Sequence, residues 1–198
     1  MRFIFIRHGE TEKNIKKLTH KTGDSTKLTK KGIRQIKECT PILKENKVEI
    51  IYYSPEKRAK ESADIISKEL KLKIKALKDF KERNWGEWEG RPWEDIKSSL
   101  DKMSLKERYN FIPPKGESWK AMELRLNRAL KLIIKGKERC VCIITHMGSL
   151  RGLMPIINNE PKESSFKYEF ENGSITIFDY KKEKYKEILV NDISHLEE

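Results

Sequence analysis

RFIFIRHGET, residues 2–11, places a short apolar run directly in front of an arginine and a histidine. Residues 2–6 combine aromatic and β-branched side chains over the length of a buried strand. Gly9 then predicts a loop that runs into a helix over residues 10–17. Arg7 and His8 are therefore expected where the first strand ends and the chain turns back.

Strands and helices alternate along the rest of the chain. Further strands are predicted over residues 48–53, 74–77 and 140–145, and the tail from 168 to 191 indicates strands, including 175–180 and 185–190. Helices are expected from Thr29 with a break at Pro41, and from Ser54-Pro55 as N-cap and first helical position. A long helix after Gly116 has an apolar face of Trp119, Met122, Leu126, Ala129 and Ile133.

This order predicts an α/β fold: a three-layer α/β/α sandwich with a mostly parallel central sheet covered by helices on both faces. With 198 residues and no internal repeat or Pro/Gly/Ser linker, the chain is expected to form a single domain over 1–198. No apolar run approaches the roughly 20 residues that span a bilayer. The opening run ends at Arg7, too early for a signal-peptide core, so a cytoplasmic protein without a membrane partner is expected.

The formal net charge is +12, with 37% charged and 36% hydrophobic residues. Such a charge is compatible with nucleic-acid binding. The lysines, however, are scattered among nearly as many acids, and no nucleic-acid motif accompanies them. We therefore interpret the charge as a solvated surface and expect no nucleic-acid partner, although a positive field would attract anionic substrates.

The three cysteines are Cys39, Cys140 and Cys142. Three is a poor basis for a disulfide framework. Cys140 and Cys142 are two residues apart in an apolar strand and so share one of its faces. Because no further His or Cys lies at a suitable spacing, we expect core thiols and no metal site.

In parallel sheets, ligands bind in the crevice beyond the carboxyl ends of the strands. The first predicted strand ends in Arg7 and His8, and Arg58 follows the second by one helical turn. Glu82 follows the third strand, and His146 ends the fourth. Two arginines, two histidines and a glutamate are therefore expected to meet at one edge of the sheet.

Together these side chains suit a phosphoryl group. Arginine presents a planar fork to two oxygens at once, an imidazole acts as a covalent nucleophile, and a carboxylic acid protonates a leaving oxygen. Free amides at the helix after Gly9 would add donors for an anion. Taken alone, Arg7 and His8 would only cap a strand, and His146 would be a hydrogen-bonded core histidine. His20 and His195 lack a position at a strand end and are predicted to be surface residues.

At residues 7–11 the sequence resembles the histidine phosphatase superfamily, in its phosphoglycerate-mutase-like branch. The resemblance covers almost the whole chain and implies a phosphoglycerate-mutase-like fold. Matching motifs recur in register at Asn14, at 28–32 with Gln35, at 54–59, at 82–90, at 116–118, at 145–151 and at 172–174.

The resemblance also implies roles. His8 would be the nucleophile, Arg7, Arg58 and His146 would bind phosphoryl oxygens, and Glu82 would be first the proton donor and then the base. The substrate-binding residues would be Asn14, Thr22, Gly23 and Met147. No metal or other cofactor is implied.

Two positions depart from the family pattern. Ser25 stands where many relatives have Asp, with Asp24 one place earlier, which affects substrate contacts from that loop. Met147-Gly148 stands where Gly-Gly is commoner, which narrows the turn after His146.

Three functions fit these residues. Hydrolysis of a small phosphorylated metabolite is favoured. A cofactor-dependent phosphoglycerate mutase would be expected to carry a lysine where this chain has Trp93, and an arginine pair where residues 106–114 hold only Arg108. A phosphate- or nucleic-acid-binding regulatory module without turnover would be expected to lack part of the catalytic set, which is complete here.

A cap or lid is expected over residues 85–114, with Trp85, Trp88, Trp93, Tyr109 and Phe111 as candidate pocket residues. The expected partner is a small phosphorylated metabolite or inorganic phosphate, and the sequence leaves monomer and homodimer open.

Overall fold

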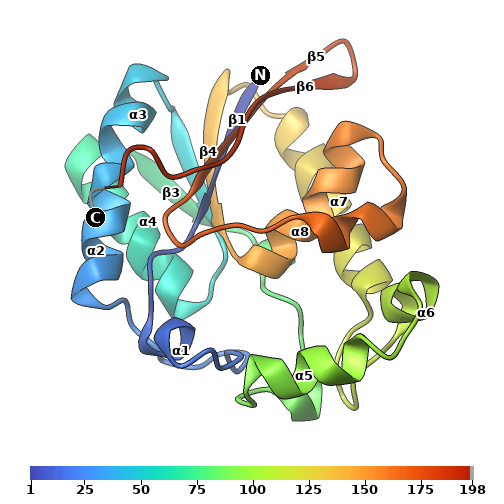
Figure 1. Ribbon diagram of the computed structural model, residues 1–198. Coiled ribbons are helices and arrows are strands. Elements are labelled where there is room, and N and C mark those ends of the chain that lie inside the picture. Colours follow the sequence, from blue (N-terminus) through green and yellow to red (C-terminus); the bar gives the residue numbers. More distant parts are fainter. Residues whose placement is uncertain (197–198) are drawn as a thin grey trace.

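The computed structural model describes residues 1–196 and has a six-stranded sheet at its centre (Figure 1). The strands are β1 (Arg2–Arg7), β2 (Ile50–Tyr53), β3 (Lys73–Ala76), β4 (Cys140–Thr145), β5 (Ile175–Lys181) and β6 (Lys184–Asp192), in the order β3-β2-β4-β1-β5-β6. The first four are mutually parallel, and β5 and β6 form an antiparallel hairpin on the β1 edge.

Helices cover both faces of this sheet. On one face lie α2 (Lys30–Glu38), α3 (Thr40–Glu45) and α4 (Lys57–Leu70), and on the other α7 (Trp119–Ile134) and α8 (Met147–Asn158). Along β1 the side chains alternate between two cores, Phe3 and Phe5 facing one layer, Ile4 and Ile6 the other. The three-layer α/β/α arrangement predicted from the sequence is thus confirmed.

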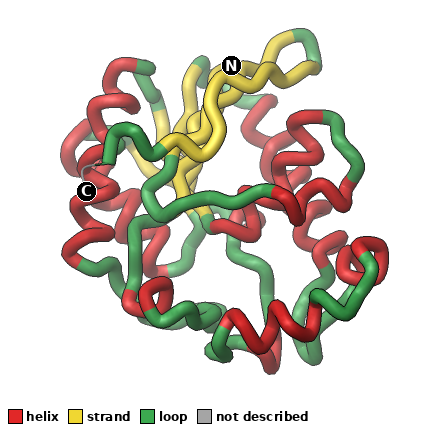
Figure 2. Tube along the Cα trace, in the orientation of Figure 1, coloured by secondary structure: helices red, strands yellow, loops and turns green. Residues whose placement is uncertain are grey.

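The remaining helices gather beyond the carboxyl ends of the parallel strands (Figure 2). They are the short α1 (Glu12–Ile15), α5 (Trp93–Leu100) and α6 (Leu105–Asn110). Residues 85–111 have a small apolar cluster of their own around Trp85, Ile96 and Leu100, separate from the two cores of the sheet. Short 3-10 helices cover Lys78–Phe80, Gly86–Trp88 and Lys162–Lys167.

Several predicted elements are confirmed. Thr29 caps α2 by accepting from Gly32 N at 3.0 Å, and Pro41 lies in the first turn of α3 after the break. The predicted inner face of α7 is buried, and Cys140 and Cys142 share one strand face as free, buried thiols.

Other boundaries were wrong. The helix predicted over 10–17 is only the four residues of α1: Thr11 is its N-cap, and the chain leaves the helix at Lys16 and has a positive φ of 51° at Lys17. The tail is extended in strands only from Ile175. The helix expected from Ser54-Pro55 begins at Lys57 with Glu56 as N-cap, because the Ser54 hydroxyl instead contacts His146 Nε2 at 2.7 Å.

Within the described part of the chain, no helix combines the length and apolar character needed to cross a membrane.

Candidate active site

His8 follows β1 directly and is almost fully buried. Its Nδ1 lies 2.8 Å from Gly9 O. Since a carbonyl only accepts, Nδ1 carries the proton and Nε2 keeps its lone pair, which accepts from Arg58 Nε at 3.2 Å. Burial, and then the charges of Arg58 and Arg7, hold the pKa of His8 well below 6.5. The imidazole is therefore a neutral base with a fixed tautomer.

Arg58 lies in the first turn of α4 with 1% of its surface exposed. Besides contacting His8, its guanidinium forms an ion pair with the carboxylate of Glu56. Its Nη1 has no hydrogen-bond partner. This guanidinium nitrogen is an unused donor on the side chain that contacts His8 Nε2.

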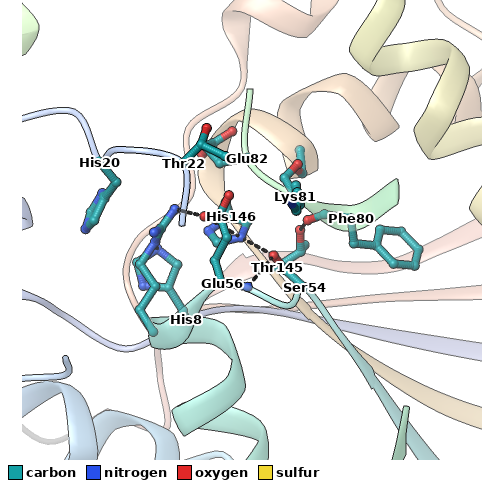
Figure 3. A network of polar contacts seen from close by, with 12 residues as sticks. His8, His20, Thr22, Ser54, Glu56, Phe80, Lys81, Glu82, Thr145 and His146 are labelled. Carbon is teal, nitrogen blue, oxygen red and sulfur yellow. Dashed lines mark hydrogen bonds and ion pairs between the residues drawn. The ribbon is translucent and has the colours of Figure 1, made fainter. Parts of the chain in front are cut away.

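His146 directly follows β4 and is the N-cap residue of α8. Its ring centroid lies 5.1 Å from that of His8, a separation short enough for both imidazoles to contact one phosphate-sized anion. Its Nε2 contacts Ser54 Oγ at 2.7 Å and lies 3.4 Å from Glu56 Oε2, while Nδ1 has no partner (Figure 3). Burial is the largest cause that holds the pKa of His146 well below 6.5, followed by the charge of Arg58.

Arg7 is buried at the end of β1, where its Nη1 donates to Phe170 O at 2.6 Å and its Nε has no partner. Burial lowers the pKa of Arg7 to about 10, so the side chain remains charged at neutral pH. Asn172 Nδ2 donates to His8 O at 2.9 Å, and Asn14 Oδ1 accepts from Thr11 N at 3.0 Å. These contacts fix the backbone around His8.

Glu82 is held by two backbone amides. Its Oε1 accepts from Arg83 N at 2.7 Å, and its Oε2 accepts from Gly148 N at 3.0 Å, in the first turn of α8. A Cβ atom added at Gly148 would lie only 2.2 Å from Glu82 Oε1. Glycine at this position therefore allows the carboxylate to lie against the helix that His146 caps.

A cavity of about 510 Å³ opens above these residues. Of the predicted site residues, Arg7, His8, Asn14, Glu82 and Met147 line it. Arg58 and His146 do not line the cavity; they are 1% and 0% exposed, and both lie close to His8. The structure therefore brings the five predicted catalytic side chains and two of the predicted substrate-binding residues to one place.

Thr22 and Gly23, also predicted to bind substrate, are exposed and do not line this cavity. Thr22 donates to Glu89 through its amide at 2.9 Å and its hydroxyl at 2.6 Å. Among the aromatic candidates, Trp85 and Trp93 line the cavity. Trp88 packs on Phe111, with ring centroids 5.1 Å apart, and Tyr109 donates to Glu123 Oε2 at 2.8 Å; none of these three residues lines the cavity.

The prediction that His20 and His195 are surface residues was wrong. His20 lines the cavity, with its ring centroid 5.8 Å from that of His8, and its Nε2 lies 2.9 Å from Thr11 Oγ1. Burial, and then Arg58, lower the pKa of His20 to about 3. The side chain of His195 is 8% exposed and packs against Cys39, with Nε2 at 3.1 Å from Gly173 O.

Two further residues were missed from the sequence. Glu56 is 5% exposed between Arg58 and His146, and burial raises the pKa of its carboxyl group. Arg83 lines the cavity, with its guanidinium carbon 4.2 Å from the ring centroid of Trp85. Neither Arg83 Nη1 nor the indole Nε1 of Trp119 has a partner.

The free energy of unfolding is expected to fall as the pH drops below about 6.5. His8, His20 and His146 are neutral when folded and take up protons on unfolding, where their pKa is about 6.5. Each contributes a slope of up to about 1.4 kcal/mol per pH unit, lost as the pH falls toward its folded pKa. For His20 this window extends down to about pH 3.

Urea unfolding of the wild type and His20→Gln at pH 6.5, 5.5 and 4.5 measures this. As the pH is lowered, the free energy of unfolding of the variant is expected to fall less steeply than that of the wild type. The difference in slope should be the contribution of one proton, up to about 1.4 kcal/mol per pH unit. Parallel losses in both proteins would contradict a neutral, buried His20.

Comparisons with known proteins cover the whole chain. Residues 3–193 match the model of the histidine phosphatase superfamily (branch 1). The uncharacterised phosphatase PhoE of Bacillus subtilis is 30% identical over 193 residues, which cover 96% of this chain and 94% of that protein. A 2,3-bisphosphoglycerate-dependent phosphoglycerate mutase of Thermoplasma acidophilum is 27% identical over 178 residues, 89% of this chain and 86% of that protein. The structure of Bacillus stearothermophilus YhfR aligns with a TM-score of 0.86 at 25% identity and covers 99% of both chains.

Proposed function

The chain belongs to branch 1 of the histidine phosphatase superfamily and is a phosphatase of that type, and from this premise we propose that it hydrolyses small phosphate monoesters through a covalent phosphohistidine at His8. The observation that carries the proposal is the state of His8. Its Nδ1–H is held by Gly9 O, and its Nε2 lone pair lies beside the guanidinium of Arg58.

In the first step, His8 Nε2 attacks the phosphorus of the ester, a P–N bond forms and the P–O bond to the alcohol breaks. Glu82, as a carboxylic acid, gives its proton to the leaving oxygen. In the second step, the carboxylate of Glu82 takes a proton from the water that attacks the phosphohistidine. The P–N bond breaks, inorganic phosphate leaves, and Glu82 is again protonated.

The charge on the phosphoryl oxygens is met by protein donors. Arg7 Nε, Arg58 Nη1 and His146 Nδ1 are buried without partners around His8. If the Ser54 hydroxyl donates to His146 Nε2, the proton of that imidazole lies on Nδ1, where it serves as a donor. Because arginine and imidazole supply this neutralisation, the proposed reaction needs no metal ion.

The remainder of the substrate would lie among Trp85, Trp93 and Arg83. The unpartnered donors of Arg83 and Trp119 favour a substrate with a second acceptor group, such as a carboxylate, some distance from the phosphoryl group. We also propose that residues 85–114, with their separate apolar cluster, act as a cap that excludes water. We therefore propose that the partner is a small phosphorylated metabolite. We also propose that the protein is cytoplasmic.

The test is an assay with p-nitrophenyl phosphate in excess chelator, followed by a panel of metabolite phosphates compared by kcat/KM. We expect metal-independent hydrolysis, with higher kcat/KM for esters that carry a carboxylate. Isomerisation of a phosphoglycerate only in the presence of a bisphosphoglycerate primer, without hydrolysis, would replace the proposal by a mutase. Chelator-sensitive turnover would contradict the metal-independent mechanism.

A further inference from the structure

The segment that carries Glu82 lies outside the sheet, and side chains satisfy its carbonyl groups. Four successive carbonyls, from Asp79 to Glu82, each accept a side-chain hydrogen bond. Thr145 Oγ1 donates to Phe80 O at 2.7 Å, as Figure 3 shows, and Ser149 Oγ donates to Lys81 O at 2.7 Å. The other contacts, including a second one to Lys81 O, come from a single residue of α7, Arg125.

Arg125 Nη1 donates to Asp79 O at 2.6 Å and to Lys81 O at 2.8 Å, and its Nη2 donates to Glu82 O at 3.0 Å. The remaining two N–H groups face the carboxylate of Glu117, with Nε–Oε2 at 3.1 Å and Nη2–Oε1 at 2.6 Å. All five N–H groups of the guanidinium therefore have an acceptor. The side chain is only 13% exposed, so these contacts are protected from water.

Glu117 also contacts the residues that follow Glu82. Its Oε1 accepts from Asn84 N at 3.0 Å, and its backbone carbonyl accepts from Arg83 Nε at 3.2 Å. The pair thus contacts the residues before and after Glu82 and the Glu82 backbone itself. Neither side chain lines the cavity.

We propose that Arg125, oriented by Glu117, is a positioning residue that fixes the carboxyl group of Glu82 for proton transfer to the leaving oxygen. The proposal rests on the function proposed above. Proton transfer requires the acid to lie within hydrogen-bond reach of the leaving oxygen, and a displacement of about 1 Å costs on the order of 100-fold in rate. A segment without ladder partners depends on these side-chain contacts to keep Glu82 in place.

The test uses Arg125→Lys, which keeps the charge but has three donors instead of five. We would measure kcat/KM for a series of phosphate esters whose alcohols range from p-nitrophenol to simple alkanols. This quantity reports phosphoryl transfer to His8. We expect a loss of on the order of 100-fold for alkyl esters and less than about 3-fold for p-nitrophenyl phosphate, which needs no proton.

Arg128→Lys is the matched control. Arg128 lies on the same helix and contacts the Asp79 side chain at 3.3 Å, but it is 69% exposed and touches none of the four carbonyls. It is expected to behave as wild type for every ester. Glu117→Gln, which retains an oxygen for Asn84 N, should show the leaving-group pattern of Arg125→Lys at smaller amplitude.

Inhibition by inorganic phosphate reports whether each variant keeps a folded anion site. An equal loss for all esters, with unchanged phosphate inhibition, would overturn the positioning role and leave the proposed function intact. Wild-type kcat/KM for alkyl esters in both Arg125→Lys and Glu117→Gln would overturn it as well. Full activity of a His8 variant would instead refute the proposed function itself.

Discussion

His8→Ala is expected to lower kcat for phosphate ester hydrolysis by a factor on the order of 10⁴ to 10⁶, because the covalent route is lost and water must attack directly. The variant keeps the donors Arg7, Arg58 and His146. Inorganic phosphate should therefore still bind and compete with the substrate for the site. Loss of turnover with retained phosphate binding would separate the nucleophile from the anion site.

The same variant tests the intermediate. Wild-type protein quenched during turnover of a ³²P-labelled ester should carry label that is stable in alkali and released by acid, as expected of a phosphohistidine. His8→Ala should carry none. Label on the variant, or label that resists acid, would place the covalent phosphoryl group on another side chain.

The position of the candidate site could be predicted from the sequence because it follows from topology. Parallel strands place their carboxyl ends at one edge of the sheet, and Arg7, His8 and His146 stand at such ends. Arg58 follows β2 within one helical turn. For these residues, knowing the strand boundaries to within one or two residues was enough.

His20 could not be predicted because its position depends on contacts between distant segments. Leu18 forms an isolated bridge with Pro92, and Thr19 N donates to Arg91 O at 3.0 Å. These contacts bind the loop after α1 to residues more than 70 positions away and so bring His20 against His8. No periodicity or spacing in the loop sequence indicates that the loop packs against residues 91–92.

Glu56 and Arg125 were missed for a related reason. Each contacts atoms that a sequence pattern does not identify, namely a neighbouring guanidinium and three backbone carbonyls. Arg125 has the helical spacing of a partly exposed position on α7, and a solvated surface arginine would look the same in the sequence. The candidate site residues Arg7, His8 and His146 can thus be predicted from strand ends, whereas the positions of Glu56 and Arg125 depend on loop and side-chain geometry.

Glu82→Gln is expected to lower kcat/KM on the order of 10²- to 10⁴-fold for alkyl phosphates, because the amide cannot protonate the leaving oxygen. For p-nitrophenyl phosphate the loss in kcat/KM should stay within about 3-fold, since that leaving group departs as an anion. Equal kcat/KM of variant and wild type on an alkyl ester would contradict the proton-donor role.

A second substitution separates the acid from its geometry. In the wild type, Arg83 N and Gly148 N each donate to an oxygen of the Glu82 carboxylate. In Glu82→Gln the side-chain NH2 group would face one of these two donors. The substitution therefore changes the local hydrogen bonds as well as the chemistry. Gly148→Ala leaves the acid in place but puts a Cβ atom 2.2 Å from its Oε1, which forces the carboxyl group to move. If proton donation from a fixed position is what Glu82 contributes, Gly148→Ala must reproduce the leaving-group dependence of Glu82→Gln while a titratable acid is still present. Wild-type alkyl-ester kcat/KM in Gly148→Ala would show that the observed carboxylate position is not the one that reacts.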